Sequence, residues 1–162
     1  MVKLKKETYL ALLFWISLST LLVAYAIQHI LGFQPCNLCL IERIPYALSL
    51  IVLVLNYKFK SDQTFYSVLL LLIFLFSLLL SLYHLGIEQG LIAESNVCKS
   101  NNIGSLTTKD AVLKSLQEIT VSCKDVAFKI FDLSLTTYNI MLSLIMFLMS
   151  IKIYFINKNI KK

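Results

Sequence analysis

Two pairs of cysteines are the residues of this chain whose type and spacing are best suited to chemistry. Cys36 and Cys39 are separated by two residues, whereas Cys98 and Cys123 enclose a longer segment. Thiol–disulfide exchange needs a thiolate, an accessible sulfur and a second thiol close enough to close the ring, and Cys-x-x-Cys spacing supplies the last of these. We therefore predict that the four cysteines move electrons through two disulfides, Cys36–Cys39 and Cys98–Cys123.

The surroundings of the close pair favour a reactive thiolate and a lipid-soluble electron acceptor. Arg43 follows Cys39 by four residues, and a helix N-terminus here would add partial positive charge. The clean apolar run begins only at Ile44, so the pair is predicted at the membrane interface, where a quinone ring is within reach. Arg43 would stabilise negative charge on a quinone oxygen or on the attacking sulfur. The alternative is an ordinary interfacial cation that pairs with Glu42.

Three other interpretations of the cysteines compete with electron transfer: a structural bridge in the distant pair, zinc binding by all four cysteines, and haem attachment at the close pair. A purely structural Cys98–Cys123 bridge would stabilise the fold by about 3 kcal/mol through loop closure. Four cysteines can bind zinc, but zinc sites favour two tight pairs, which Cys98 and Cys123 do not supply. Covalent haem attachment is disfavoured because Leu40, not histidine, follows Cys39.

Two histidines, His29 and His84, fall near the same predicted end of their helices. Such a pair can ligate a b-type haem, although two isolated histidines are weak evidence for one. His84 is predicted either at the rim of a quinone pocket or as a simple interfacial residue. His29 is predicted to be interfacial.

The elements that must position these residues are membrane helices. The chain of 162 residues is 58% hydrophobic and 15% charged, and its mean hydropathy is +0.78. A span needs about 20 apolar residues, and the uncharged stretches predict an all-α bundle within one membrane domain, residues 1–162. The four predicted spans cover about 9–30, 40–57, 64–84 and 133–155, and the outer loops about 31–39 and 85–132. The second span is short, and Pro45 is expected to start or kink it.

The distribution of charge predicts the orientation. Nine lysines and two acidic residues at the chain ends and the 57–63 turn give +7, whereas the cysteine-bearing side carries six basic and seven acidic residues, or −1. By the positive-inside rule both termini are cytoplasmic. This pattern also accounts for the net charge of +6 without nucleic-acid binding. A cleaved signal peptide ending near Ala24-Tyr25-Ala26 is disfavoured, because the preceding apolar run is too long.

The long outer loop is expected to contain a short amphipathic helix. Thr107-Thr108-Lys109-Asp110 can cap a helix that presents Val112, Leu113, Leu116 and Ile119 on one face. It would rest on the membrane surface or cover the top of the bundle. Aromatic residues near the span ends are expected to form interfacial belts without a chemical role: Tyr46, Tyr57, Phe65, Tyr66 and Tyr83.

Three segments together carry a family resemblance. They are Pro35-Cys36-x-x-Cys39-x-x-Glu42-Arg43, Tyr83-His84-x-Gly86-Ile87-Glu88, and Cys123-Lys124-Asp125 leading to Leu133-Ser134-Leu135-x-x-Tyr138-Asn139. The chain resembles the disulfide bond formation protein B (DsbB) family over nearly its whole length. Vitamin K epoxide reductase relatives also combine four cysteines with a quinone, but their Cys-x-x-Cys follows the loop pair, opposite to the order here.

The resemblance implies a four-helix enzyme of the bacterial inner membrane that reoxidises a periplasmic thioredoxin-fold dithiol oxidase, DsbA. It implies that Cys98 receives the partner's thiolate, Cys123 exchanges with Cys36, and Cys39 reacts with ubiquinone or menaquinone beside Arg43. It implies no metal or flavin. Where many relatives have Pro-Trp, this chain has Ala127-Phe128, which weakens inference about how the loop docks. The competing hypothesis is a non-catalytic membrane anchor with structural disulfides.

Overall fold

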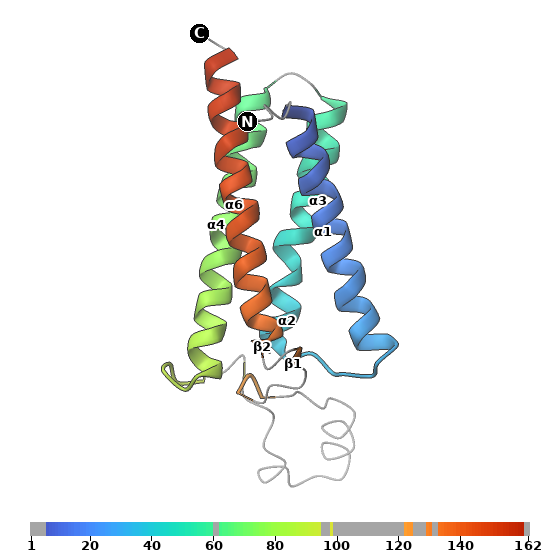
Figure 1. Ribbon diagram of the computed structural model, residues 1–162, viewed down its shortest axis with the longest axis vertical. Helices are drawn as coiled ribbons and strands as arrows, with labels where there is room; N and C mark the ends of the chain where they lie inside the picture. Colours follow the sequence, from blue (N-terminus) through green and yellow to red (C-terminus); the bar gives the residue numbers. More distant parts are fainter. Residues whose placement is uncertain are drawn as a thin grey trace, which may run out of the picture.

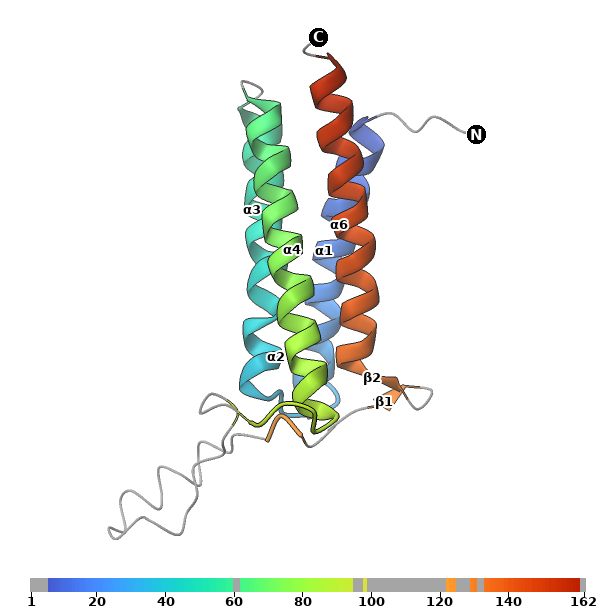
Figure 2. The same cartoon turned by 90° about the vertical axis from the view of Figure 1, so that its left-hand side faces the viewer.

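A bundle of long helices forms the body of the protein. The computed structural model describes residues 6–59, 62–94, 98, 122–124, 129–130 and 133–160. In this part of the chain four long helices run side by side (Figure 1, Figure 2). They are α1 (Lys6–His29), α3 (Arg43–Lys58), α4 (Gln63–Glu88) and α6 (Leu135–Ile160). A one-turn helix, α2 (Asn37–Ile41), precedes α3, and a small antiparallel hairpin of β1 (Lys129–Ile130) and β2 (Leu133–Ser134) precedes α6.

Among the residues that the structure describes, four helical segments are long and apolar enough to cross a membrane. They are Lys6–His29, Asn37–Lys58, Gln63–Glu88 and Leu135–Asn159, with α2 and α3 together forming the second. This confirms the predicted all-α, four-helix membrane fold. The beginning of α1 and the end of α6 lie at one end of the bundle, and α2 and the hairpin lie at the other, called the cysteine end below (Figure 1). The amphipathic helix predicted from Thr107 lies outside the described residues.

A break at Glu42 separates α2 from α3 within the second span. Pro45 has no N–H to donate to the carbonyl of Ile41, so a continuous helix would lose that hydrogen bond. As the third residue of α3, Pro45 occupies the first turn, where backbone N–H groups have no partner within the helix. The structure therefore has a break just before the proline, close to the start or kink that the sequence predicts, and the two helices remain one span.

The end of α4 is fixed by a glycine turn that folds the chain back on the helix. Gly90 has a φ of +73°, in the left-handed region that favours glycine. Its N–H bonds to the carbonyl of Ile87, and the N–H of Leu91 bonds to the carbonyl of Gly86, which is the Schellman pattern of helix ends. Ile92 then packs so tightly on Gly86 that an added Cβ would lie 2.6 Å from its Cδ1. The segment after α4 is thus held at the cysteine end.

The surface of the bundle is largely apolar, as expected of a protein surrounded by lipid. Trp15, Leu22 and Phe76 are exposed by 62%, 61% and 57%. The core between the helices contains large buried side chains: Leu13, Tyr46, Leu70, Phe74, Met146 and Ile153. The prediction that Tyr46 belongs to an interfacial belt is wrong, because its side chain is only 2% exposed.

Candidate active site

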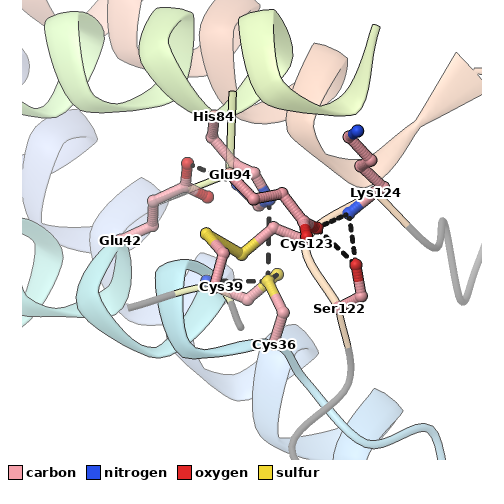
Figure 3. Close-up of a disulfide and its surroundings, with 9 residues drawn as sticks. Cys36, Cys39, Glu42, His84, Glu94, Ser122, Cys123 and Lys124 are labelled. Atoms are coloured by element: carbon pink, nitrogen blue, oxygen red, sulfur yellow. Dashed lines mark hydrogen bonds and ion pairs between the residues drawn. A yellow bond between two sulfur atoms is a disulfide. The ribbon is translucent and has the colours of Figure 1, made fainter. Parts of the chain in front are cut away.

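Cys36 and Cys39 face each other across the single turn of α2 (Figure 3). Cys36 is the N-cap residue, and its Sγ accepts a hydrogen bond of 3.3 Å from the backbone N–H of Cys39. The two Sγ atoms are 2.9 Å apart and hydrogen-bonded, so the pair is a dithiol in this structure. The Cys36–Cys39 disulfide expected from the sequence is not formed here and stays a prediction for the oxidised protein.

His84 connects the sulfur of Cys36 to the carboxylate of Glu42. Its Nε2 lies 3.6 Å from Cys36 Sγ, and its Nδ1–H donates to Glu42 Oε1 at 3.0 Å. The three residues are buried, and a buried carboxylate is stable only when it is paired. Glu42 therefore fixes the imidazole with one nitrogen turned toward the thiol (Figure 3). The alternative in which Glu42 pairs with its neighbour Arg43 does not describe this structure.

These contacts make Cys36 the more acidic thiol of the pair. The hydrogen bond between the side chains of Cys36 and Cys39 is the largest contribution to lowering the pKa of Cys36 to about 4. The His84 side chain and the backbone N–H of Cys39 lower this pKa further, whereas burial opposes them. Because the thiolate is the nucleophile in disulfide exchange, the dithiol state presents Cys36 as a thiolate at neutral pH.

The second cysteine pair lies against the first. Cys98 and Cys123 form a disulfide, and both are buried in one cluster with Cys36, Leu38 and Ile87. The close-up shows Cys123 beside the sulfurs of the close pair (Figure 3). The chain next to it is held by Glu94: its carboxylate accepts hydrogen bonds from the Ser122 hydroxyl and, at 3.3 Å, from the backbone N–H of Lys124.

A cavity of about 580 Å³ opens beside the thiols, between α1, α3, α4 and α6. Cavities of a few hundred to about 1,000 Å³ hold small organic ligands. Cys36, Cys39 and Cys123 line its wall together with Arg43 and His84. The remaining wall is formed in large part by apolar side chains of α1 and α6, among them Ile16, Leu21 and Leu142.

Arg43 is held at this cavity by α1. Its Nη1 donates to Gln28 Oε1 at 2.6 Å, its Nη2 to the carbonyl of Ala24 at 3.5 Å, and its guanidinium lies 5.1 Å from the centre of the Tyr25 ring. None of these partners carries a negative charge, so the positive charge of Arg43 is not neutralised by them. A cation in a largely apolar cavity favours a ligand that carries or develops negative charge.

The structure therefore brings together most of the residues singled out from the sequence. Cys36, Cys39, Cys123, Arg43 and His84 line one cavity, and Cys98 is joined to Cys123. His29 is an exception: it is exposed and stacks on Tyr25 with 6.2 Å between ring centres. Sequence reasoning also missed two residues of the cavity wall, Tyr46 and Asn139. The Tyr138-Asn139 motif of the family resemblance was a signal for the second.

The four-cysteine zinc site considered from the sequence does not agree with the disulfide in this structure. Cys98 and Cys123 are bonded to each other, so they offer no thiolate to a four-cysteine zinc site. Cys36, Cys39 and His84 have ligand atoms within 4.8 Å of one another. These atoms already form hydrogen bonds with one another, and both ring nitrogens of His84 have a hydrogen-bond partner, Cys36 Sγ on one side and Glu42 on the other.

Comparison with known proteins supplies independent information. The family of disulfide bond formation protein DsbB matches residues 6–153. An uncharacterized protein of Rickettsia prowazekii (strain Madrid E) is 30% identical over 146 residues, which cover 87% of this chain and 85% of that protein. No solved structure matches the chain.

Proposed function

Because this chain belongs to the DsbB family of membrane disulfide bond formation proteins, we propose that it is a thiol:quinone oxidoreductase. It reoxidises a soluble thioredoxin-fold dithiol oxidase of the DsbA type and passes the electrons to a membrane quinone, either ubiquinone or menaquinone. The observation that carries this proposal is the position of both cysteine pairs in one buried cluster, at the wall of a cavity that also contains Arg43.

The first half of the reaction is exchange between disulfides. A thiolate of the partner attacks Cys98, which breaks the Cys98–Cys123 bond and releases Cys123 as a thiolate. Cys123 then attacks Cys36 of the oxidised close pair, and Cys39 leaves. When the partner's second thiol resolves the mixed disulfide, Cys98 is released and attacks Cys123, which restores the loop disulfide and frees Cys36. The partner has lost two electrons and two protons, and Cys36 and Cys39 hold them as a dithiol.

The second half is quinone reduction at the same pair. Two electrons and two protons leave Cys36 and Cys39, the disulfide forms between them, and the quinone becomes a quinol. Cys39 is proposed to react with the quinone, and Arg43 to stabilise the negative charge that develops on the quinone oxygen. His84, held by Glu42, is proposed to stabilise the Cys36 thiolate and to accept its proton. The predicted place of His84 at the rim of a quinone pocket is supported by its position on the cavity wall.

The proposed location is the bacterial inner membrane, with both termini in the cytoplasm and the cysteine end on the periplasmic side. The excess of lysines at the opposite end supports this orientation. An oxidising compartment is also where disulfides persist.

The test is anaerobic quinone reduction by the purified protein, driven by a reduced thioredoxin-fold partner. Cys39→Ser and Cys98→Ser should each abolish turnover, because each breaks one half of the relay. Ser17→Ala, which keeps all four cysteines and removes a hydroxyl that bonds to Ser49 away from the cavity, is the matched control and should retain most of the turnover. If the wild type itself fails to reduce quinone and both disulfides are inert toward the partner, the non-catalytic anchor hypothesis replaces this proposal.

A further inference from the structure

Five polar side chains from three helices form a continuous hydrogen-bonded cluster inside the bundle. The Tyr46 hydroxyl donates to Asn139 Oδ1 at 2.5 Å and lies 3.1 Å from Ser143 Oγ. Asn139 Nδ2 donates to Ser81 Oγ at 2.8 Å, and Ser143 Oγ lies 3.0 Å from Ser77 Oγ. The cluster thus joins α3, α4 and α6, and its geometry is fixed from several sides.

Two members of this cluster line the cavity of the candidate active site, and the other three lie behind them. Tyr46 and Asn139 form part of the cavity wall, whereas Ser77, Ser81 and Ser143 are at most 1% exposed. Tyr46 follows Arg43 by one helical turn, so the tyrosine lies deeper in the bundle than the arginine. The cavity is therefore polar at two depths, at Cys39 and Arg43 toward the cysteine end and at Tyr46 and Asn139 further in.

The chemistry of this inner polar position suits a ligand that changes between acceptor and donor. The Asn139 amide has two hydrogens, one of which bonds to Ser81. Its oxygen accepts hydrogen bonds, and the Tyr46 hydroxyl can both donate and accept. A quinone oxygen only accepts hydrogen bonds, whereas the corresponding quinol hydroxyl also donates. An amide beside a phenol can serve both forms with a small rearrangement, which a purely cationic or purely anionic group cannot.

We propose that Tyr46 and Asn139 bind the quinone oxygen that points away from Cys39, and so form the second anchoring point of the ring. This inference rests on the proposed quinone-reducing function and adds a binding position to it. Arg43 holds the oxygen near the thiols, and the Tyr46–Asn139 pair holds the opposite one, so the ring is fixed between Cys39 and the cluster. The three serines position the pair without touching the quinone.

The competing explanation is that the cluster only joins helices, since buried hydroxyl and amide groups in membrane proteins commonly do so. The two explanations differ in what Tyr46→Phe changes. That substitution removes one hydroxyl and keeps the ring that fills the core. If the hydroxyl contributes to binding as an ordinary hydrogen bond, its loss weakens quinone binding by about five- to tenfold.

The experiment measures quinone affinity by the rise in unfolding temperature of the purified protein with increasing concentration of a short-tailed benzoquinone. Tyr46→Phe and Asn139→Leu should each require about five- to tenfold more quinone for the same rise. Ser17→Ala is the matched control: Ser17 bonds to Ser49 at 2.8 Å between α1 and α3, both are fully buried, and neither lines the cavity. It should lower the unfolding temperature without changing quinone affinity.

The single-turnover rate at which the protein oxidises its partner's dithiol should be unchanged in the control Ser17→Ala, because Ser17 does not line the cavity. Quinone affinity equal to that of the wild type in both Tyr46→Phe and Asn139→Leu would overturn the binding role and leave only helix joining. A wild type that neither gains stability from quinone nor reduces it would instead overturn the proposed function, so the two failures are distinguishable.

Discussion

The acidity of Cys36 predicts an unusual pH dependence of its reaction with alkylating agents. With a pKa of about 4, Cys36 keeps about nine-tenths of its thiolate when the pH falls from 7 to 5. A thiol with the ordinary value of 9.0 loses about a hundredfold over the same interval, a factor of ten for each pH unit. The diagnostic quantity is this profile rather than the rate at pH 7, because the nucleophilicity of a thiolate falls together with its pKa.

The assay uses a Cys98→Ser, Cys123→Ser background, in which only the close pair reacts. The reduced protein is treated with iodoacetamide between about pH 5 and pH 8, and mass spectrometry locates the product on Cys36 or Cys39. Two substitutions at Cys39 test whether its hydrogen bond causes the low pKa of Cys36. Cys39→Ala removes the largest contribution to the lowered pKa of Cys36, so its profile should steepen toward that of an ordinary thiol. Cys39→Ser keeps a hydroxyl donor and should steepen the profile less.

A decrease of about a hundredfold between pH 7 and pH 5 for Cys36 in the background protein would refute the reasoning. The same conclusion would follow if Cys39→Ala and Cys39→Ser gave identical profiles, since the donated hydrogen bond would then have no role. Loss of the acid-resistant reaction in a Cys36→Ser variant is the control that assigns it.

Three further substitutions test other parts of the site. His84→Gln keeps a hydrogen-bonding side chain but removes the imidazole, so the alkylation rate of Cys36 should fall more steeply as the pH decreases. An unchanged pH dependence would show that His84 does not stabilise the thiolate. Arg43→Ala should raise the KM for quinone by about ten- to a hundredfold, because it removes a charged hydrogen-bond donor. Single-turnover oxidation of the partner should be unchanged. An equal loss of rate in both reactions would indicate a structural role for Arg43. Gly86→Ala places a Cβ 2.6 Å from Ile92 Cδ1, the far end of a flexible side chain that is 38% exposed, while alanine favours the helix by about 1 kcal/mol over glycine. Ile92 should therefore shift and the unfolding temperature should change little. A decrease equivalent to about 3 kcal/mol would show that Ile92 is held rigidly against Gly86.

Much of the architecture could be predicted from the sequence because the signals are local. Uncharged runs long enough for a span are visible without knowledge of packing, and the two-residue spacing places Cys36 and Cys39 together in any helix. Pro45 also acts locally, and the break in the second span lies next to it.

The features that sequence reasoning missed depend on contacts between distant segments. Glu42 has Arg43 as its neighbour in sequence, yet its partner is His84, which α4 brings back to the cysteine end. Tyr46 was expected at the lipid interface because it lies near the end of a span. The face of the helix on which Tyr46 lies is set by packing, and that face meets Asn139 of α6.

The most direct test of the central claim is a single turnover without the partner. The dithiol form of the Cys98→Ser, Cys123→Ser protein is mixed with quinone in the absence of oxygen, and free thiols and quinol are measured in the same sample. The proposed function predicts that two thiols are lost, and one Cys36–Cys39 disulfide is formed, for each quinol produced. Quinone that stays oxidised beside intact Cys36 and Cys39 thiols would contradict it.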